Sequence, residues 1–279
     1  MTHRIDQRFA DLKRDGRKGL IPFITAGDPL PEATVAIMHA LVAAGADLIE
    51  LGVPYSDPVA DGPTIQHSSE RAIARGIGLT RILGWVSEFR QTDSTTPVVL
   101  MGYLNPIEIF GYARFADEAS AAGVDGVLIV DVPVEEADAV TLLREKGLRE
   151  IFLVAPTTTE HRLAAIRAQA QGFVYYVSFS GITGASHLDP AAVRGRVEHI
   201  KQGGDIPVAV GFGVRDAESA VKIAESADAV VIGSALVEML AQAADASAAM
   251  AAAGAFLAPI RAALDVAARN WKRHQETSV

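Results

Sequence analysis

The chain has 279 residues, of which 49% are hydrophobic, so it can bury one large core, although this length alone allows one domain or two. Lysine and arginine together number 25 and aspartate and glutamate 34, giving a net charge of −9, which argues against a nucleic-acid partner because such a partner needs a basic surface. There is no cysteine, which excludes disulfides, thiolate metal sites and cysteine nucleophiles.

The chain also lacks the marks of a membrane or multidomain protein. Its N-terminus has no apolar signal core, and no run of 18 apolar residues occurs. We therefore expect a soluble, cytoplasmic protein with no membrane partner. No Ser/Gly/Pro-rich linker and no charge block marks a boundary, so residues 1–279 are expected to form one domain.

Short apolar runs rich in Val and Ile recur along the chain and predict eight strands. They span residues 21–25, 48–51, 98–101, 126–130, 151–154, 174–178, 208–210 and 229–232. Amphipathic stretches of helical length lie between them, among them 31–44, 107–122, 134–146 and 217–225. This alternation predicts parallel βαβ units, and eight buried strands favour a closed (β/α)8 TIM barrel over an open sheet.

The two ends of the chain are expected to add helices to this barrel. A helix should precede the first strand, and the Ala-rich segment 241–269 should form outer helices that Gly254 and Pro259 interrupt. A short internal repeat supports a chain built from similar units, because an aspartate ends the turn before three of the predicted strands. These turns read Gly45-Ala46-Asp47, Gly123-Val124-Asp125 and Ser226-Ala227-Asp228.

The segment 46–63 carries the strongest chemical signal. Glu50 lies in an otherwise apolar run, and burying an unpaired carboxylate there costs several kcal/mol, so its pKa should rise and make it an acid and base near neutrality. Prolines and glycines then stiffen the loop that presents Asp61. The alternative is a structural glutamate paired with a Lys or Arg, but two acids flanking one stiff loop favour a functional site.

A glycine-bearing turn follows each of the last three predicted strands, and together these turns suggest a phosphate site. They are 181–184, 211–213 and 233–234. Glycine lets a backbone approach a ligand closely, and Ser234 is expected to cap the helix 235–240 and to contact an anion. The alternative is that these glycines only make tight turns. The seven histidines are scattered singly, so no metal site is expected.

Three segments, 20–29, 49–66 and 180–185, together resemble the α subunit of tryptophan synthase, and the resemblance runs over nearly the whole chain. It implies a lyase of L-tryptophan biosynthesis that cleaves indole-3-glycerol phosphate to indole and D-glyceraldehyde 3-phosphate. Glu50 would be the acid and base, and Asp61 would stabilise charge at the indole nitrogen. Tyr175, expected to point into the barrel, is the third catalytic candidate.

The resemblance also implies binding residues. The phosphate contacts would be Gly184, Gly213, Gly233 and Ser234, and Thr183 would meet the catalytic aspartate when a lid at 180–187 closes. Residues expected to line an aromatic pocket are Phe23, Ile65, Leu100, Tyr103, Ile129 and Phe212. Phe179 stands where many members carry arginine, so a lid contact made by that arginine is not carried over.

The family's α subunit works with a β subunit in an α2β2 assembly. Pyridoxal phosphate belongs to that partner, and no cofactor is expected in this chain. The contacts would lie at 55–58, 105–106 and 131–133. Three alternatives stay open: a sugar-phosphate isomerase or epimerase, a non-catalytic activator that gates a partner, and a free-standing lyase that releases indole.

Overall fold

The computed structural model describes residues 2–136, 141–177, 190–202, 204–211 and 213–277. Each of the eight predicted runs coincides with strand structure in this part of the chain. The strands are β1 (Gly19–Thr25), β2 (Ile49–Gly52), β3 (Val98–Gly102), β4 (Gly126–Ile129), β5 (Arg149–Glu150), β6 (Phe152–Val154), β7 (Val174–Val177), β8 (Val208–Gly211) and β9 (Ala229–Ile232). Their order in the sheet is β5-β4-β3-β2-β1-β9-β8-β7-β6, and the paired strands run parallel.

The barrel closes through one broken strand. The predicted strand 151–154 begins earlier and is split at Ile151 into β5 and β6. β5 pairs with β4, β6 pairs with β7, and the Ile151 N–H donates to the Val127 carbonyl at 2.9 Å. The two ends of the sheet are therefore adjacent in the chain, which confirms the predicted TIM barrel and corrects the bounds of its fifth strand.

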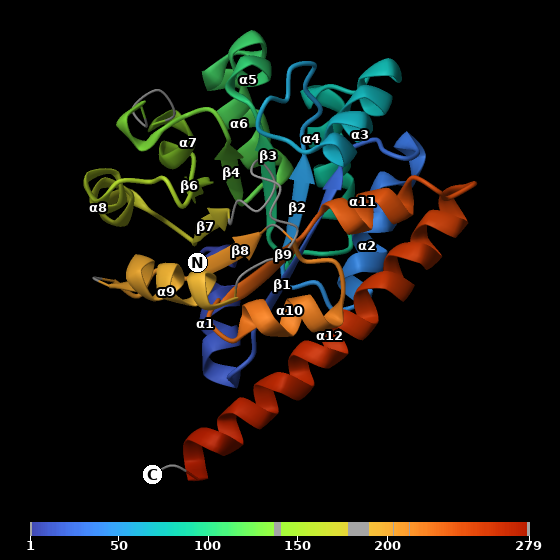
Figure 1. Ribbon diagram of the computed structural model, residues 1–279. Helices are drawn as coiled ribbons and strands as arrows, with labels where there is room; N and C mark the ends of the chain where they lie inside the picture. Colours follow the sequence, from blue (N-terminus) through green and yellow to red (C-terminus); the bar gives the residue numbers. More distant parts are fainter. Residues whose placement is uncertain (1, 137–140, 178–189, 203, 212, 278–279) are drawn as a thin grey trace.

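Helices surround the barrel, as Figure 1 shows. They are α1 (Arg4–Asp15), the 3₁₀ turn η1 (Pro31–Ala33), α2 (Thr34–Ala43), α3 (Pro63–Ala74), α4 (Leu79–Phe89), α5 (Leu104–Phe110), α6 (Tyr112–Ala122), α7 (Thr141–Glu145), α8 (Glu160–Gln169), α9 (Pro190–Lys201), α10 (Ala217–Ala224), α11 (Ser234–Leu240) and α12 (Ala246–Thr277). The predicted helix 107–122 is two helices that meet at Gly111, whose φ of 94° a helix cannot accommodate. Of the predicted helix 134–146, residues 137–140 lie outside the described part.

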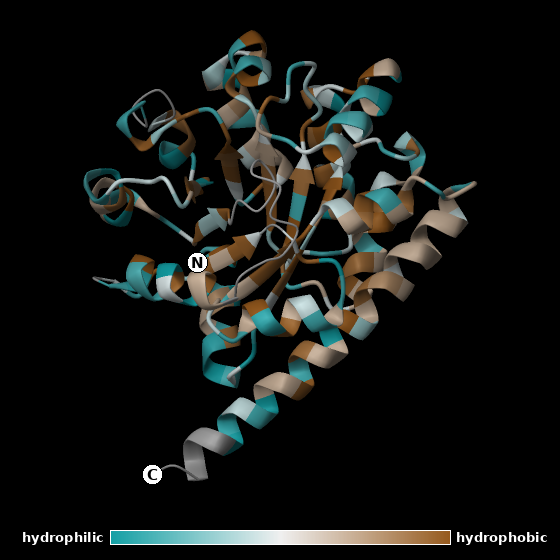
Figure 2. Ribbon diagram, in the orientation of Figure 1, coloured by the Kyte–Doolittle hydropathy of each residue, from teal (hydrophilic) through white to brown (hydrophobic). Residues whose placement is uncertain are grey.

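The prediction that Gly254 and Pro259 interrupt the Ala-rich tail is wrong, because both lie inside the single helix α12. One face of α12 is buried against α2, α10 and α11, and this packing outweighs the local cost of a proline. The buried face includes Ala249, Ala253, Leu257, Ile260 and Leu264. Among the described helices, α12 alone is long and apolar enough to cross a membrane, a test that core helices of soluble proteins also pass. Its one-sided burial and mixed hydropathy (Figure 2) are typical of an amphipathic packing helix.

The strands separate two apolar layers, because successive side chains of a strand point to opposite faces. One layer fills the barrel and includes Leu48, Val99, Leu128 and Tyr175. The other lies between the barrel and the helices and includes Ile49, Leu51, Leu100, Ile129 and Tyr176. This confirms the prediction that Tyr175 points inward.

The predicted N-terminal helix, α1, closes the amino end of the barrel. Its apolar residues Ile5, Phe9 and Leu12 belong to the inner layer, and the rings of Phe9 and Phe173 lie 5.5 Å apart. Ile5 also lies beside Gly126, where β4 begins. A ligand must therefore enter the barrel from the carboxyl ends of the strands, where TIM barrels carry their active sites.

The repeated aspartates have a structural role at the same amino end. Each carboxylate accepts a backbone N–H from a strand next to the one it precedes: Asp47 from Leu20, Asp125 from Val98 and Asp228 from Val208, at 2.8–2.9 Å. Each also pairs with a cation, Arg261, Arg90 and Lys201 respectively. The aspartate repeated in the sequence therefore marks a hydrogen bond that ties two neighbouring strands together, and it does not mark a ligand site.

Candidate active site

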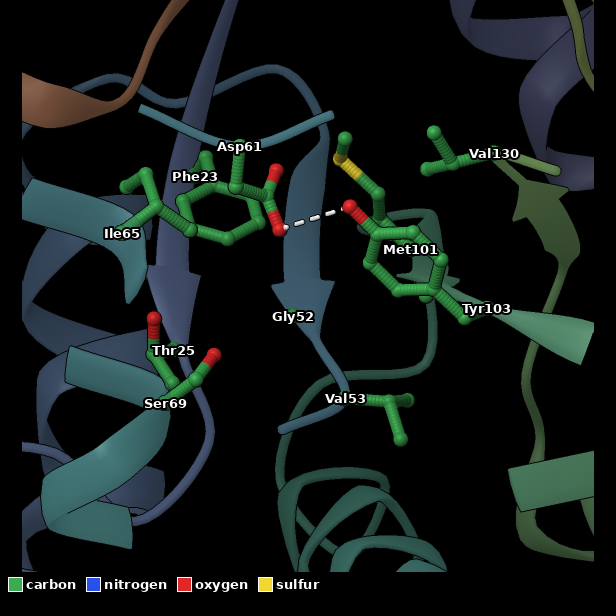
Figure 3. Close-up of a pocket in the computed structure, with 11 residues that line it drawn as sticks. Phe23, Thr25, Gly52, Val53, Asp61, Ile65, Ser69, Met101, Tyr103 and Val130 are labelled. Carbon is green, nitrogen blue, oxygen red and sulfur yellow. Dashed lines mark hydrogen bonds between the residues drawn. The ribbon is translucent and has the colours of Figure 1, made fainter. Parts of the chain in front are cut away.

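A cavity of about 890 Å³ opens at the carboxyl ends of the strands. It brings together acids and glycines that lie far apart in the sequence. Of the predicted site residues, its lining includes Phe23, Glu50, Asp61, Ile65, Tyr175, Gly213, Gly233 and Ser234. Tyr103 lines a small adjoining pocket together with Asp61 (Figure 3).

Glu50 is a buried acid without a partner. It projects into the barrel from the middle of β2, only 1% of its surface is exposed, and neither carboxyl oxygen has a hydrogen-bond partner among the described residues. Burial, with a further contribution from the nearby Asp61, raises the pKa of Glu50 from 4.5 to about 8. Glu50 is therefore a neutral proton donor at pH 7, and the alternative of a salt-bridged structural glutamate is not supported.

Asp61 is held above Glu50 by the loop between β2 and α3. The Tyr103 hydroxyl donates to Asp61 Oδ2 at 3.2 Å (Figure 3). The same hydroxyl accepts from the Ala60 N–H at 3.1 Å. The Gln66 amide donates to the Asp61 carbonyl at 2.8 Å, which ties the loop to α3. Burial raises the pKa of Asp61 to about 6, and the hydrogen bond from Tyr103 opposes this rise. Asp61 is therefore ionised where Glu50 is neutral.

Tyr175, on β7, lines the same cavity as the two acids. Its ring is 8% exposed, and burial, together with the charges of Glu50 and Asp61, raises its pKa well above 10, so it stays a neutral phenol. The ring can take this position because Gly211, on the neighbouring strand β8, has no side chain: a Cβ there would overlap the Tyr175 hydroxyl.

The structure does not bring two predicted pocket residues into the cavity. Leu100 and Ile129 face the helices, and the residues that line the cavity from the same strands are Met101 and Val130. The predictions for these two positions are wrong by one residue, and in a strand a shift of one residue moves a side chain to the opposite face.

The expected phosphate end is described in part. Gly213, Gly233 and Ser234 line the cavity where β8 and β9 end. Ser234 is the first residue of α11 and does not cap it; Gly233 holds the cap position, without a side-chain bond. Thr183, Gly184 and Phe212, with Phe179 and the expected lid at 180–187, lie outside the described residues. Within the described part, no three or more His, Asp or Glu side chains are grouped to hold a metal ion.

The cavity also includes two cations that the sequence did not single out. Arg162 and Arg215 are the arginines among the lining residues. Asp131 also lines the cavity, and its carboxylate accepts a hydrogen bond from the Leu104 N–H, the first of α5, at 2.8 Å. Exposed cations such as these two follow no periodic pattern in the sequence, so only the three-dimensional structure places them here.

The buried acid makes the stability of the fold depend on pH. Between about pH 4.5 and 8 the folded chain keeps a proton on Glu50 that the unfolded chain has lost, so this residue lowers stability as the pH rises through that range. Glu50→Gln does not titrate. We expect it to be more stable than the parent at pH 8 by about 2–4 kcal/mol, with the difference shrinking towards pH 5.

Urea unfolding curves at pH 5, 6.5 and 8 measure this difference, and Glu70→Gln, which changes an exposed glutamate of α3, is the control. A constant difference between Glu50→Gln and the parent over this pH range would show that Glu50 is ionised in the folded chain.

Both the sequence and the fold of the chain resemble those of known proteins. The family model described as "Tryptophan synthase alpha chain" matches residues 9–263. The tryptophan synthase alpha chain of Xanthomonas axonopodis pv. citri (strain 306) is 61% identical over 264 residues, which is 94% of this chain and 98% of that protein. The tryptophan synthase alpha chain of Xylella fastidiosa (strain M12) is 58% identical over 264 residues, again 94% of this chain and 98% of that protein. The crystal structure of tryptophan synthase subunit alpha from Legionella pneumophila str. Paris superposes with a TM-score of 0.89 at 44% identity, covering 95% of this chain and 99% of that one. A chain of the tryptophan synthase complex from Pyrococcus furiosus has a TM-score of 0.76 at 40% identity, covering 88% and 98%. The chain belongs to the tryptophan synthase alpha chain family.

Proposed function

We propose that this chain cleaves indole-3-glycerol phosphate to indole and D-glyceraldehyde 3-phosphate, as the α subunit of a tryptophan synthase. Membership of the family supports the reaction. The observation that carries the mechanism is the unpartnered, neutral carboxyl of Glu50 in the same cavity as the ionised Asp61. Their surroundings give the two acids different pKa values, about 8 for Glu50 and about 6 for Asp61. One site can therefore hold a proton donor beside a stabilising negative charge.

The reaction breaks the bond between C3 of indole and the hydroxyl-bearing carbon of the glycerol chain. Indole C3 leaves only once it is protonated, and Glu50 supplies that proton. The protonated ring carries positive charge at its N–H, which the Asp61 carboxylate stabilises. The Glu50 carboxylate then takes the proton of the glycerol hydroxyl as the C–C bond breaks, and the aldehyde forms. Glu50 ends the cycle protonated, so no metal or organic cofactor is required in this chain.

The ends of the cavity match the two ends of this substrate. Phe23, Ile65, Met101 and Val130 offer an apolar wall for the indole ring close to Asp61 (Figure 3). Gly213 and Gly233 leave room for a phosphate to approach the backbone, and the first N–H groups of α11 have no partner within their own helix. We assign the phosphate to this end, with Ser234 beside it.

Of the three alternatives, the same arrangement argues against the non-catalytic activator. An isomerase or epimerase would leave the carbon skeleton intact, so product analysis separates it from a lyase. A non-catalytic activator has no need of a buried, unpartnered acid, which costs stability. A free-standing lyase would use the same two acids and differs only in its independence of a partner.

The lyase assay tests this proposal directly. With indole-3-glycerol phosphate as substrate, kcat/KM should follow a bell-shaped pH profile with limbs near 6 and 8, because Asp61 must be ionised and Glu50 protonated. Glu50→Gln should lower kcat by about 100-fold or more, since the amide has the shape of the acid without its labile proton. Asp57→Asn, an exposed acid of the same loop, is the control.

A Glu50→Gln turnover above a tenth of that of the parent would mean that Glu50 is not the acid and base. Absence of indole production by the folded parent, with and without a β subunit, would overturn the proposed function itself.

We further propose a β subunit as the partner, in an α2β2 assembly in the cytoplasm, with pyridoxal phosphate held by that partner. The related Pyrococcus furiosus chain comes from a tryptophan synthase complex, which supports such an assembly. The three expected contact regions of this chain meet on one rim: the Asn105 amide donates to the Tyr55 hydroxyl at 3.2 Å, and Asp131 accepts from Leu104. Val59 and Ile109 lie close to two of these regions in the sequence and are 86% and 82% exposed, the degree of apolar exposure that a partner surface explains.

A charged residue on this rim should weaken the assembly. We expect Ile109→Glu to lower the affinity for a β subunit at least tenfold and to leave the lyase activity of the isolated chain unchanged, because the side chain points away from the cavity into solvent. Val266→Glu, at an exposed apolar site on α12, is the control.

Titration of a β subunit into each variant, followed by calorimetry and by the rate of indole release, measures this effect. Equal affinities for Ile109→Glu and Val266→Glu would place the partner elsewhere on the molecule or exclude it.

A further inference from the structure

The cavity has an unfavourable charge balance for the proposed substrate. Its described lining includes two cations, Arg162 and Arg215, and four acids, of which Glu50 is neutral near pH 7; the other three are Asp61, Asp131 and Glu238. The chain as a whole has a net charge of −9. A phosphate dianion is therefore not drawn in by the overall field, and a local positive charge must offset it.

Arg162 is already committed to another partner. It lies on α8, and its Nε donates to Glu135 Oε1 at 2.9 Å, outside the glycine-bearing end of the cavity. Arg215, in contrast, has no ion pair with any of the residues that the structure describes, although it is exposed at the cavity wall. The neighbouring acid does not neutralise it, because Asp216 caps α10 by accepting the Ser219 N–H at 2.8 Å.

The backbone of Arg215 is nevertheless held in place. Its N–H donates to Ser219 Oγ at 3.0 Å, so the residue is tied to the first turn of α10. It follows Gly213 by two residues, and both line the same cavity as Gly233 and Ser234. The long side chain on this anchor can bring its guanidinium to an anion bound at this end, and its planar donors suit a phosphate.

We propose that Arg215 binds the phosphate group of the substrate and supplies the positive charge that the rest of the cavity lacks. This assignment rests on the proposed function, because it takes the phosphate end of that same substrate as the ligand. Arg215 contacts a part of the substrate that does not react, so its contribution is equal in the ground state and the transition state. Its removal therefore raises KM and leaves kcat unchanged.

The test compares Arg215→Gln and Arg215→Lys with Arg194→Gln, which removes an exposed arginine of α9 that pairs with Glu225 away from the cavity. For indole-3-glycerol phosphate, Arg215→Gln should raise KM about five- to tenfold with kcat within twofold of the parent, the effect of losing one exposed charge-assisted contact. Arg215→Lys should recover part of this loss, and Arg194→Gln should show none. Indole-3-glycerol, the same molecule without its phosphate, should be turned over equally by all four proteins.

A binding measurement keeps this inference separate from the proposed function. Calorimetric titration with glycerol 3-phosphate needs no turnover, and Arg215→Gln should weaken its binding by the same factor as it raises KM. A KM for Arg215→Gln equal to that for Arg194→Gln, or an equal change with the phosphate-free substrate, would overturn the role of Arg215. A parent that binds glycerol 3-phosphate through Arg215 but releases no indole would contradict the lyase proposal and leave this inference standing.

Discussion

The site depends on one carboxyl group that is buried without a partner. Glu50 belongs to β2, where its neighbours across the sheet are Phe23 on β1 and Val99 on β3, both apolar. A charged carboxylate in such surroundings would cost several kcal/mol, so the group remains neutral near pH 7 and keeps its proton for the substrate. A lysine or arginine beside it would stabilise the fold and remove this chemistry.

The architecture around Glu50 serves to hold this group in place. α1 closes the amino end of the barrel, so the acid faces a cavity that opens on one side only. Gly52 allows the Phe23 ring to lie across β2, since a Cβ there would overlap that ring. Tyr103 holds Asp61 by one hydrogen bond and lowers its pKa relative to that of Glu50, which keeps the two acids in different protonation states.

Much of this arrangement could be predicted from the sequence, for physical reasons. A glutamate inside an apolar strand conflicts with burial, and such a conflict is visible without a structure. So are the eight short apolar runs that alternate with stretches of helical length. The wall of the cavity was less predictable. The predicted wall residues Leu100 and Ile129 are each one position before the residues that line the cavity, Met101 and Val130. Which side chains of a strand face inward is set by its pairing with the neighbouring strands, here Glu50 opposite Val99, and the sequence does not reveal that pairing. The expected break at Pro259 is wrong for a related reason: packing of the buried face of α12 outweighs the low helix propensity of proline.

The central claim is that Glu50 is neutral in the folded protein at pH 7, and its own titration tests this most directly. Carbon-13 NMR of the chain with labelled glutamate side-chain carboxyls, with the Glu50 signal assigned by its absence in Glu50→Gln, follows that titration. The account predicts a midpoint near pH 8 in the parent and a lower midpoint in Asp61→Asn, because Asp61 contributes to the shift. A Glu50 signal that titrates near 4.5, the ordinary value for a glutamate, would contradict the account.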